Sequence, residues 1–267
     1  MNVSYIDFVE IISGEIFFLA ISMARVYAFM VFIPCFLFGL IKGKLKVSLV
    51  ISVAIIITPL TKFHLSVDNL SIYDIASVVM AEMIKGVVIG VLVSLPFWIV
   101  ESYGGLIDNQ RGTLMGGQIN TALGQDDFTP LGYFFKNLLG IIIIINFGFY
   151  FILEILMSSY SIWPINRTLP DLSAQKFEYW LQFLKNYISI IILYSAPVVV
   201  VLMLIDLASG ILNILAPQAQ VNMIAIPIKC LAGIFILIIM MLMYRDLMVE
   251  LFFDFSKVIK YFVGGAQ

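Results

Sequence analysis

The chain has 267 residues, of which 62% are hydrophobic and only 12% are charged, and its mean hydropathy is +1.06. Soluble domains carry roughly a quarter of charged residues, so this composition excludes an ordinary soluble protein. The net charge is −2 with no basic block, which gives no electrostatic support for a nucleic-acid partner. Continuous apolar runs also exclude an outer-membrane barrel, whose strands alternate apolar and polar residues. We therefore expect an all-α, polytopic helical membrane protein of packed helical hairpins.

The N-terminal region holds three apolar segments. Ile11–Phe38 is long enough to cross a bilayer, and the N-terminal MNVSYIDFVEIISGE lacks the basic region of a cleaved signal peptide. The basic run KGKLK (residues 42–46) lies beside two expected spans, which predicts a cytoplasmic loop. Val47–Leu60 is short for a span, which needs roughly 20 residues. Ile72–Val100 is the third segment.

Pro96–Gly132 is the least membrane-like stretch, and we expect it to form a compact loop. It is polar and rich in glycine, with Gly104, Gly105, Gly112, Gly116, Gly117 and Gly124. Glycine permits close approach of backbones and positive φ. Composition alone is also compatible with a solvated linker, whereas the length favours a functional loop.

After this loop, the hydrophobic pattern predicts one membrane span and one helical hairpin. Leu138–Met157 is the span. Phe183–Leu212 and Ile224–Tyr244 are joined by a short polar loop, which is typical of a helical hairpin. The tail 245–267 is expected to form an interfacial helix. These segments sum to six spans, with both termini outside if KGKLK is inside.

Charged residues within the apolar segments are the candidate functional groups, because an ionised group in a membrane costs several kcal/mol unless it is paired or faces water. They are Glu15, Arg25, Glu82, Lys85, Asp206 and Lys229. Salt bridges between helices or subunits are one interpretation, and a proton relay is the other. Asp206 and Lys229, on opposite arms of the hairpin, are expected to pair with each other or with a neighbouring subunit. Asp108 and Arg111 are expected to pair locally at i and i+3.

No enzyme site, cofactor site or metal site is expected. The single His64 has no triad partners in the sequence, and no phosphate-binding glycine loop with a following Lys-Ser or Lys-Thr occurs. Cys35 and Cys230 both lie in apolar surroundings, which favours buried thiols over a disulfide or a metal pair.

A series of short motifs from about Met80 to Tyr244 resembles a known family. The motifs are EMIKGVVIG (82–90), PFWIVES (96–102), IDNQRG (107–112), Asn120, TPLG (129–132), Trp163-Pro164, Pro197 and DLASGILNILAPQAQVNMIAIPIK (206–229). In order and spacing they resemble the SctT/SpaR inner-membrane export-apparatus proteins of type III secretion, which are relatives of flagellar FliR. IDNQRG and the Trp-Pro pair look like the injectisome branch.

The resemblance implies a subunit of the type III secretion export gate, forming the entrance channel for unfolded proteins that cross the bacterial inner membrane. It implies one copy within a helical hetero-oligomer of other export-apparatus membrane subunits, which would protrude to the periplasmic side. Residues 1–180 would be similar to the larger partner and residues 181–267 to the smaller one.

The resemblance also implies site residues. The loop at about 104–132 would contribute to a channel plug formed by Asp108, Gln110, Arg111, Gly112, Leu114, Met115, Gly116, Gly117, Ile119, Asn120 and Leu123. The expected subunit interface comprises Glu82, Lys85, Glu101, Asp206, Asn213, Pro217, Gln218, Asn222 and Lys229. The remaining alternatives are a small-solute secondary transporter that uses Glu82, Asp206 and Lys229 as a coupling site, and a structural scaffold of a secretion ring.

Overall fold

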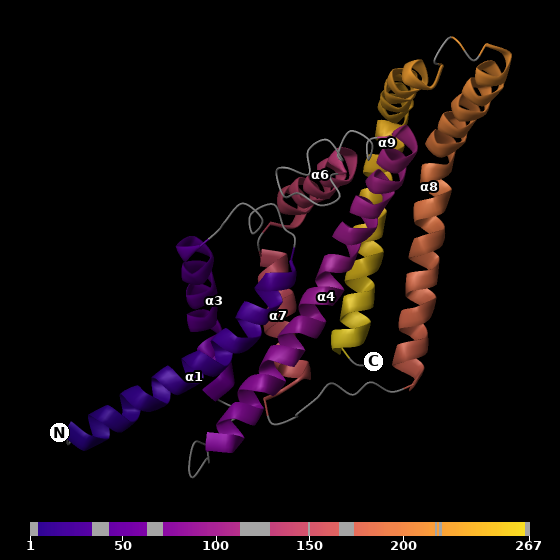
Figure 1. The fold of residues 1–267 in the computed structure, drawn as a ribbon. Coiled ribbons are helices and arrows are strands. Elements are labelled where there is room, and N and C mark those ends of the chain that lie inside the picture. The colour runs from indigo at the N-terminus through magenta and orange to yellow at the C-terminus, as the bar shows by residue number, and fades with distance from the viewer. Residues whose placement is uncertain are drawn as a thin grey trace. The chain divides into compact units, whose positions relative to one another are not determined.

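The computed structural model describes residues 5–33, 43–62, 72–112, 129–148, 150–165, 174–216, 218 and 221–264. Within these ranges the regular structure is helical and no strand occurs, which confirms the all-α class (Figure 1). The helices are α1 (Tyr5–Phe32), α3 (Lys44–Lys62), α4 (Ile72–Arg111), α6 (Pro130–Phe147), α7 (Tyr150–Ile162), α8 (Ala174–Leu215) and α9 (Val221–Gly264).

Five of the described helices carry a segment long and apolar enough to span a membrane, against the six spans that the sequence predicts. These segments are 14–32, 44–61, 73–111, 181–215 and 223–241. Four helices contain an internal proline, at Pro59, Pro96, Pro197 and Pro227. Proline is tolerated inside membrane helices because neighbouring groups satisfy the freed carbonyls.

The expected loop from Pro96 is wrong for its first half, because α4 continues as helix to Arg111. The reason is visible in the burial pattern. Val100, Tyr103 and Ile107 are buried at helical spacing, while polar Ser102 and Asn109 are exposed. Ser102 and Asn109 therefore lie on the exposed face of a helix. Gly112 ends α4 with φ of 79°, the left-handed conformation that commonly terminates helices.

The expected single span at 138–157 is also wrong. Helix α6 ends at Phe147 and α7 begins at Tyr150, with Gly148 between them at φ of 67°. A residue in the left-handed region cannot continue an α-helix, so this glycine divides one apolar run into two helices. The C-terminal tail is helical, but it continues α9 to Gly264 without a break at Tyr244.

The chain folds as two compact units. Unit 1 comprises residues 1–95, 144–174 and 255–267, and unit 2 comprises residues 96–143 and 175–254. In unit 1, α1 packs closely on α4 because Gly86 and Gly90 present no side chain. A methyl group added at Gly86 would overlap the Arg25 carbonyl oxygen, and one at Gly90 would lie 2.9 Å from that of Phe29. This small-xxx-small spacing is the usual way for membrane helices to approach.

In unit 2, α8 and α9 form the hairpin that the sequence predicts (Figure 1). Their contacts run antiparallel, since Asp206 of α8 meets Lys229 of α9 and Tyr194 meets Tyr244 further along.

Candidate functional site

Three buried charges of unit 1 form one network. Arg25 of α1 holds the Glu82 carboxylate of α4 with two bonds, Nε to Oε2 at 2.6 Å and Nη2 to Oε1 at 2.9 Å. Lys85, one turn further along α4, donates to the same carboxylate at 2.8 Å. All three side chains are fully buried. Two cations thus share one carboxylate, which leaves one positive charge for other groups to stabilise.

The C-terminal end of α7 supplies those groups. Arg25 donates to the Trp163 carbonyl at 2.9 Å, and Lys85 donates to the Pro164 carbonyl at 3.1 Å. Unpaired carbonyls at a helix C-terminus carry a partial negative charge that favours cations. The guanidinium of Arg25 also lies 3.8 Å from the ring centre of Tyr160, a cation–π geometry. The network therefore ties α1, α4 and α7 together.

A second polar cluster, which we call the base clasp, joins the end of α4 to the start of α6 in unit 2. Asp108 accepts a hydrogen bond from the Leu131 backbone N–H at 2.7 Å and forms an ion pair with Arg111. Glu101 pairs with Lys136 of α6 at 2.6 Å. The base clasp comprises these five residues. It fixes the two ends of the connection between α4 and α6 against each other.

Glycines allow the two helices of the base clasp to touch. A methyl group added at Gly104 would lie 2.5 Å from the Gly132 backbone nitrogen, far inside van der Waals contact. A methyl group at Gly132 would lie 2.7 Å from the Glu101 carbonyl oxygen. Only a missing side chain on both helices permits this separation.

The hairpin contacts the same end of α4. Lys229 of α9 pairs with Asp206 of α8 at 2.5 Å and donates to the Gln110 carbonyl at 3.3 Å. One turn further along α9, Gly233 accommodates the Arg111 side chain, whose Cδ would lie 2.7 Å from an added methyl group. Lys229 therefore binds one carbonyl in the last turn of α4, where a cation is favoured.

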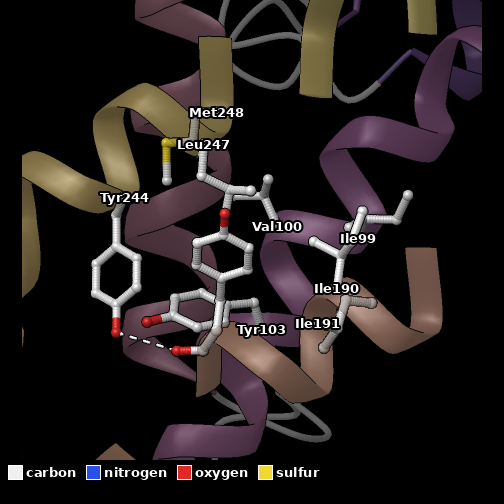
Figure 2. A pocket seen from close by; sticks show the side chains of 9 residues that line it. Ile99, Val100, Tyr103, Ile190, Ile191, Tyr244, Leu247 and Met248 are labelled. Atoms are coloured by element: carbon white, nitrogen blue, oxygen red, sulfur yellow. Dashed lines mark hydrogen bonds between the residues drawn. The ribbon is translucent and has the colours of Figure 1, made fainter. Parts of the chain in front are cut away.

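An aromatic cluster supports this arrangement. The ring of Tyr103 in α4 lies 5.3 Å from that of Phe135 in α6 and 4.9 Å from that of Tyr244 in α9. The Tyr244 hydroxyl donates to the Tyr194 carbonyl of α8 at 3.3 Å. Figure 2 draws a hydrogen bond of this hydroxyl as a dashed line. Burial raises the pKa of the Tyr244 phenol, so the hydroxyl keeps the proton that it donates.

The family of the chain follows from comparison with known proteins. The model of the bacterial export proteins, family 1, matches residues 16–255, which covers all the contacts above. The chain belongs to this family.

Individual relatives agree with that membership. The surface presentation of antigens protein SpaR of Shigella flexneri is 34% identical over 158 residues, which are 59% of this chain and 60% of that protein. The secretion system apparatus protein SsaT of Salmonella typhimurium is 34% identical over 168 residues, 62% of this chain and 64% of that protein. The flagellar biosynthetic protein FliR of Bacillus subtilis is 27% identical over 162 residues, 60% of this chain and 62% of that protein. The chain thus matches a little under two thirds of the length of each.

Several charges that the sequence singles out are paired within the export-family chain. Glu82 of α4 meets Arg25 of α1, and Asp206 of α8 meets Lys229 of α9, so these charges form the salt bridges between helices that one interpretation predicts. Lys85 pairs with Glu82 within α4. Asp108 and Arg111 form the expected local pair. Contact of these residues with another subunit stays a prediction.

The other predicted site residues are spread along the chain. Glu101 and Gln110 take part in the contacts at the end of α4, and Gly112 ends that helix. Asn213 lies half-buried near the end of α8, Gln218 is exposed between the hairpin arms, and Asn222 lies in the first turn of α9. The remaining predicted residues lie outside the described ranges: Leu114, Met115, Gly116, Gly117, Ile119, Asn120, Leu123 and Pro217. His64 and Cys35 lie outside them as well.

Sequence reasoning missed six partners in the unit 1 network and the base clasp. They are Ser159, Tyr160 and the carbonyls of Trp163 and Pro164 around Arg25 and Lys85, and Leu131 and Lys136 in the base clasp. Lys136 was detectable, because it is a lone cation within an apolar run. The others are common residue types or backbone groups and carry no signal. Among the described residues, no group of His, Cys, Asp and Glu could hold a metal ion.

Proposed function

We propose that the chain is a subunit of a type III secretion export gate, through which unfolded proteins cross the bacterial inner membrane. The observation that carries this proposal is the family match over residues 16–255, together with a relative whose name is secretion system apparatus protein. Its partners would be the other membrane subunits of the export apparatus. Residues 1–180 would occupy a place like that of the larger partner and residues 181–267 a place like that of the smaller one.

The ion pairs favour this proposal over a small-solute transporter. A coupling site needs charges that are accessible to ions or protons at the midplane of the membrane. Glu82 is fully buried and bound by two cations, so it lacks that access. Asp206 is bound by Lys229. These groups serve to hold helices together, as a channel wall or an assembly subunit requires.

We propose further that the connection after α4 is a plug that closes the resting channel. Its glycines allow backbones to pack across a narrow lumen, and Leu114, Met115, Ile119 and Leu123 supply apolar side chains that exclude water. The base clasp supports this idea, since it fixes where the connection leaves α4 and where it enters α6. Such a segment can move aside while the helices stay folded.

Membrane conductance tests the plug. The variant lacking Thr113–Gly124, co-expressed with its partners, should assemble and yet pass small ions in the absence of substrate. A second variant replaces the same residues with a Gly-Ser stretch of equal length. It should also pass small ions, because it lacks the apolar side chains. A deletion variant that assembles and remains as tight as the wild type would show that the connection is a solvated linker.

Purification in mild detergent tests the proposed function itself. A tagged export subunit should copurify within a large hetero-complex, whose intact mass exceeds that of any small oligomer of this chain. A transporter would run as a small oligomer of one kind of chain. A scaffold would copurify in a complex but would give no conductance in either the wild type or the deletion variant.

A further inference from the structure

Unit 1 carries a groove that neither the ion-pair networks nor the proposed function uses. It lies between α1 and the first turns of α3 and has a volume of about 750 Å³. Its lining includes Tyr27, Lys44, Lys46, Val47, Ser48 and Ile51. This volume is within the range of about 300–1,000 Å³ that small-molecule sites occupy.

One end of the groove carries two positive charges that no described acidic residue pairs with. Lys44 is exposed and Lys46 is half-buried, and neither has an ion-pair partner among the described residues. Both lie in the first turn of α3, which contains no acidic residue. The N-terminus of a helix already carries a partial positive charge and favours anions. This end of the groove therefore favours an anion over a cation.

The rest of the groove is lined by apolar side chains of both helices. Val47 and Ile51 of α3 lie four residues apart, with exposed fractions of 47% and 36%, and Tyr27 of α1 is 47% exposed. Val47 and Ile51 are about 6 Å apart along α3, since each helical residue rises 1.5 Å. A soluble anion would leave this surface unused.

We propose that this groove binds one anionic phospholipid, with its phosphate at Lys44, Lys46 and the N-terminus of α3 and one acyl chain along Val47 and Ile51. Basic grooves between membrane helices on the cytoplasmic side suit anionic headgroups. The KGKLK run also predicts the cytoplasmic side for this end of α3. Charge and apolar surface thus match the two portions of one lipid molecule.

Native mass spectrometry of the purified complex, delipidated and then supplied with lipid, tests the proposal. The probes are dioleoyl phosphatidylglycerol and dioleoyl phosphatidylcholine. The wild type should bind one phosphatidylglycerol much more tightly than phosphatidylcholine. The variant Lys44→Gln/Lys46→Gln should bind phosphatidylglycerol on the order of 30-fold more weakly, because each lysine near a membrane surface contributes about five-fold. Lys44→Arg/Lys46→Arg keeps the charge and should bind like the wild type.

A second control and a competitor complete the design. Lys185→Gln removes an exposed lysine of α8 and should leave binding unchanged. Inorganic phosphate should fail to displace the lipid at concentrations that leave the complex intact. Equal binding of both lipids by the wild type would overturn the proposal without any variant. Unchanged binding by the double glutamine variant, or full displacement by inorganic phosphate, would overturn it as well.

Discussion

Removing the Glu82 carboxylate should destabilise the protein more than removing the Lys85 ammonium that it binds. The change Glu82→Gln preserves the shape of the side chain but leaves Arg25 and Lys85 as two buried cations without a counter-charge. Breaking a buried pair by removing one partner costs about 3–5 kcal/mol in the free energy of unfolding. We expect Glu82→Gln to lie in that range.

The charge balance of the network predicts a much smaller cost for Lys85→Met. This change removes the surplus positive charge and keeps the bidentate pair of Arg25 and Glu82. No buried charge is left without a counter-charge, and Met has a volume similar to that of Lys, so we expect a cost below about 1 kcal/mol. The double variant Glu82→Gln/Lys85→Met should be more stable than Glu82→Gln alone, by about 1–3 kcal/mol in the free energy of unfolding.

A denaturant titration in mild detergent, monitored by circular dichroism, measures these differences in the free energy of unfolding. The control Glu154→Gln alters an exposed carboxylate of α7 and should change stability by less than about 0.5 kcal/mol. The reasoning is refuted if Glu82→Gln is as stable as this control. It is equally refuted if Lys85→Met costs more than Glu82→Gln, because the network would then not carry a surplus positive charge.

Three further predictions concern unit 2. Gly104→Ala should cost about 1–3 kcal/mol by forcing α4 away from α6, whereas Gly210→Ala, with open space around it, should be neutral or stabilising by up to about 1 kcal/mol; thermal unfolding of both decides. Asp108→Ala should increase cleavage of the α4–α6 connection by added protease, because it opens the base clasp, and unchanged cleavage would contradict that role. Lys229→Met should lower the yield of assembled complex relative to the exposed control Lys185→Gln, and equal yields of both would disprove the pairing idea.

The helices of this chain could be predicted wherever apolar runs were long, but their ends depended on single residues. The arms of the hairpin were found from hydrophobicity alone. The helix over 96–111 was missed because its polar residues and Gly104 are typical of a loop, whereas the structure uses the glycine for contact with Gly132. The break at Gly148 was missed because one left-handed residue leaves the hydropathy unchanged.

In the candidate site, contacts between residues close in the sequence could be predicted, and contacts between distant residues could not. Pairs at i and i+3, such as Asp108 with Arg111, follow from helix geometry and could be predicted. The partner of Glu82 could not, since Arg25 lies 57 residues away and reaches it only through the packing of α1 on α4. The hydrogen bond that the Leu131 backbone N–H donates to Asp108 could not be predicted either, because the side chain of Leu131 takes no part in it.

Site-specific crosslinking to a secreted protein arrested in transit tests the central claim most directly. A photoreactive residue at Leu114, within the proposed plug, is placed in the assembled complex in cells that express a substrate fused to a domain that cannot unfold. The same residue at Tyr73, exposed at the start of α4, is the control. We predict a crosslink from position 114 to the arrested substrate, absent without substrate and absent from position 73. An arrested substrate that crosslinks to neighbouring subunits but never to position 114 would contradict the claim that this chain forms the channel entrance.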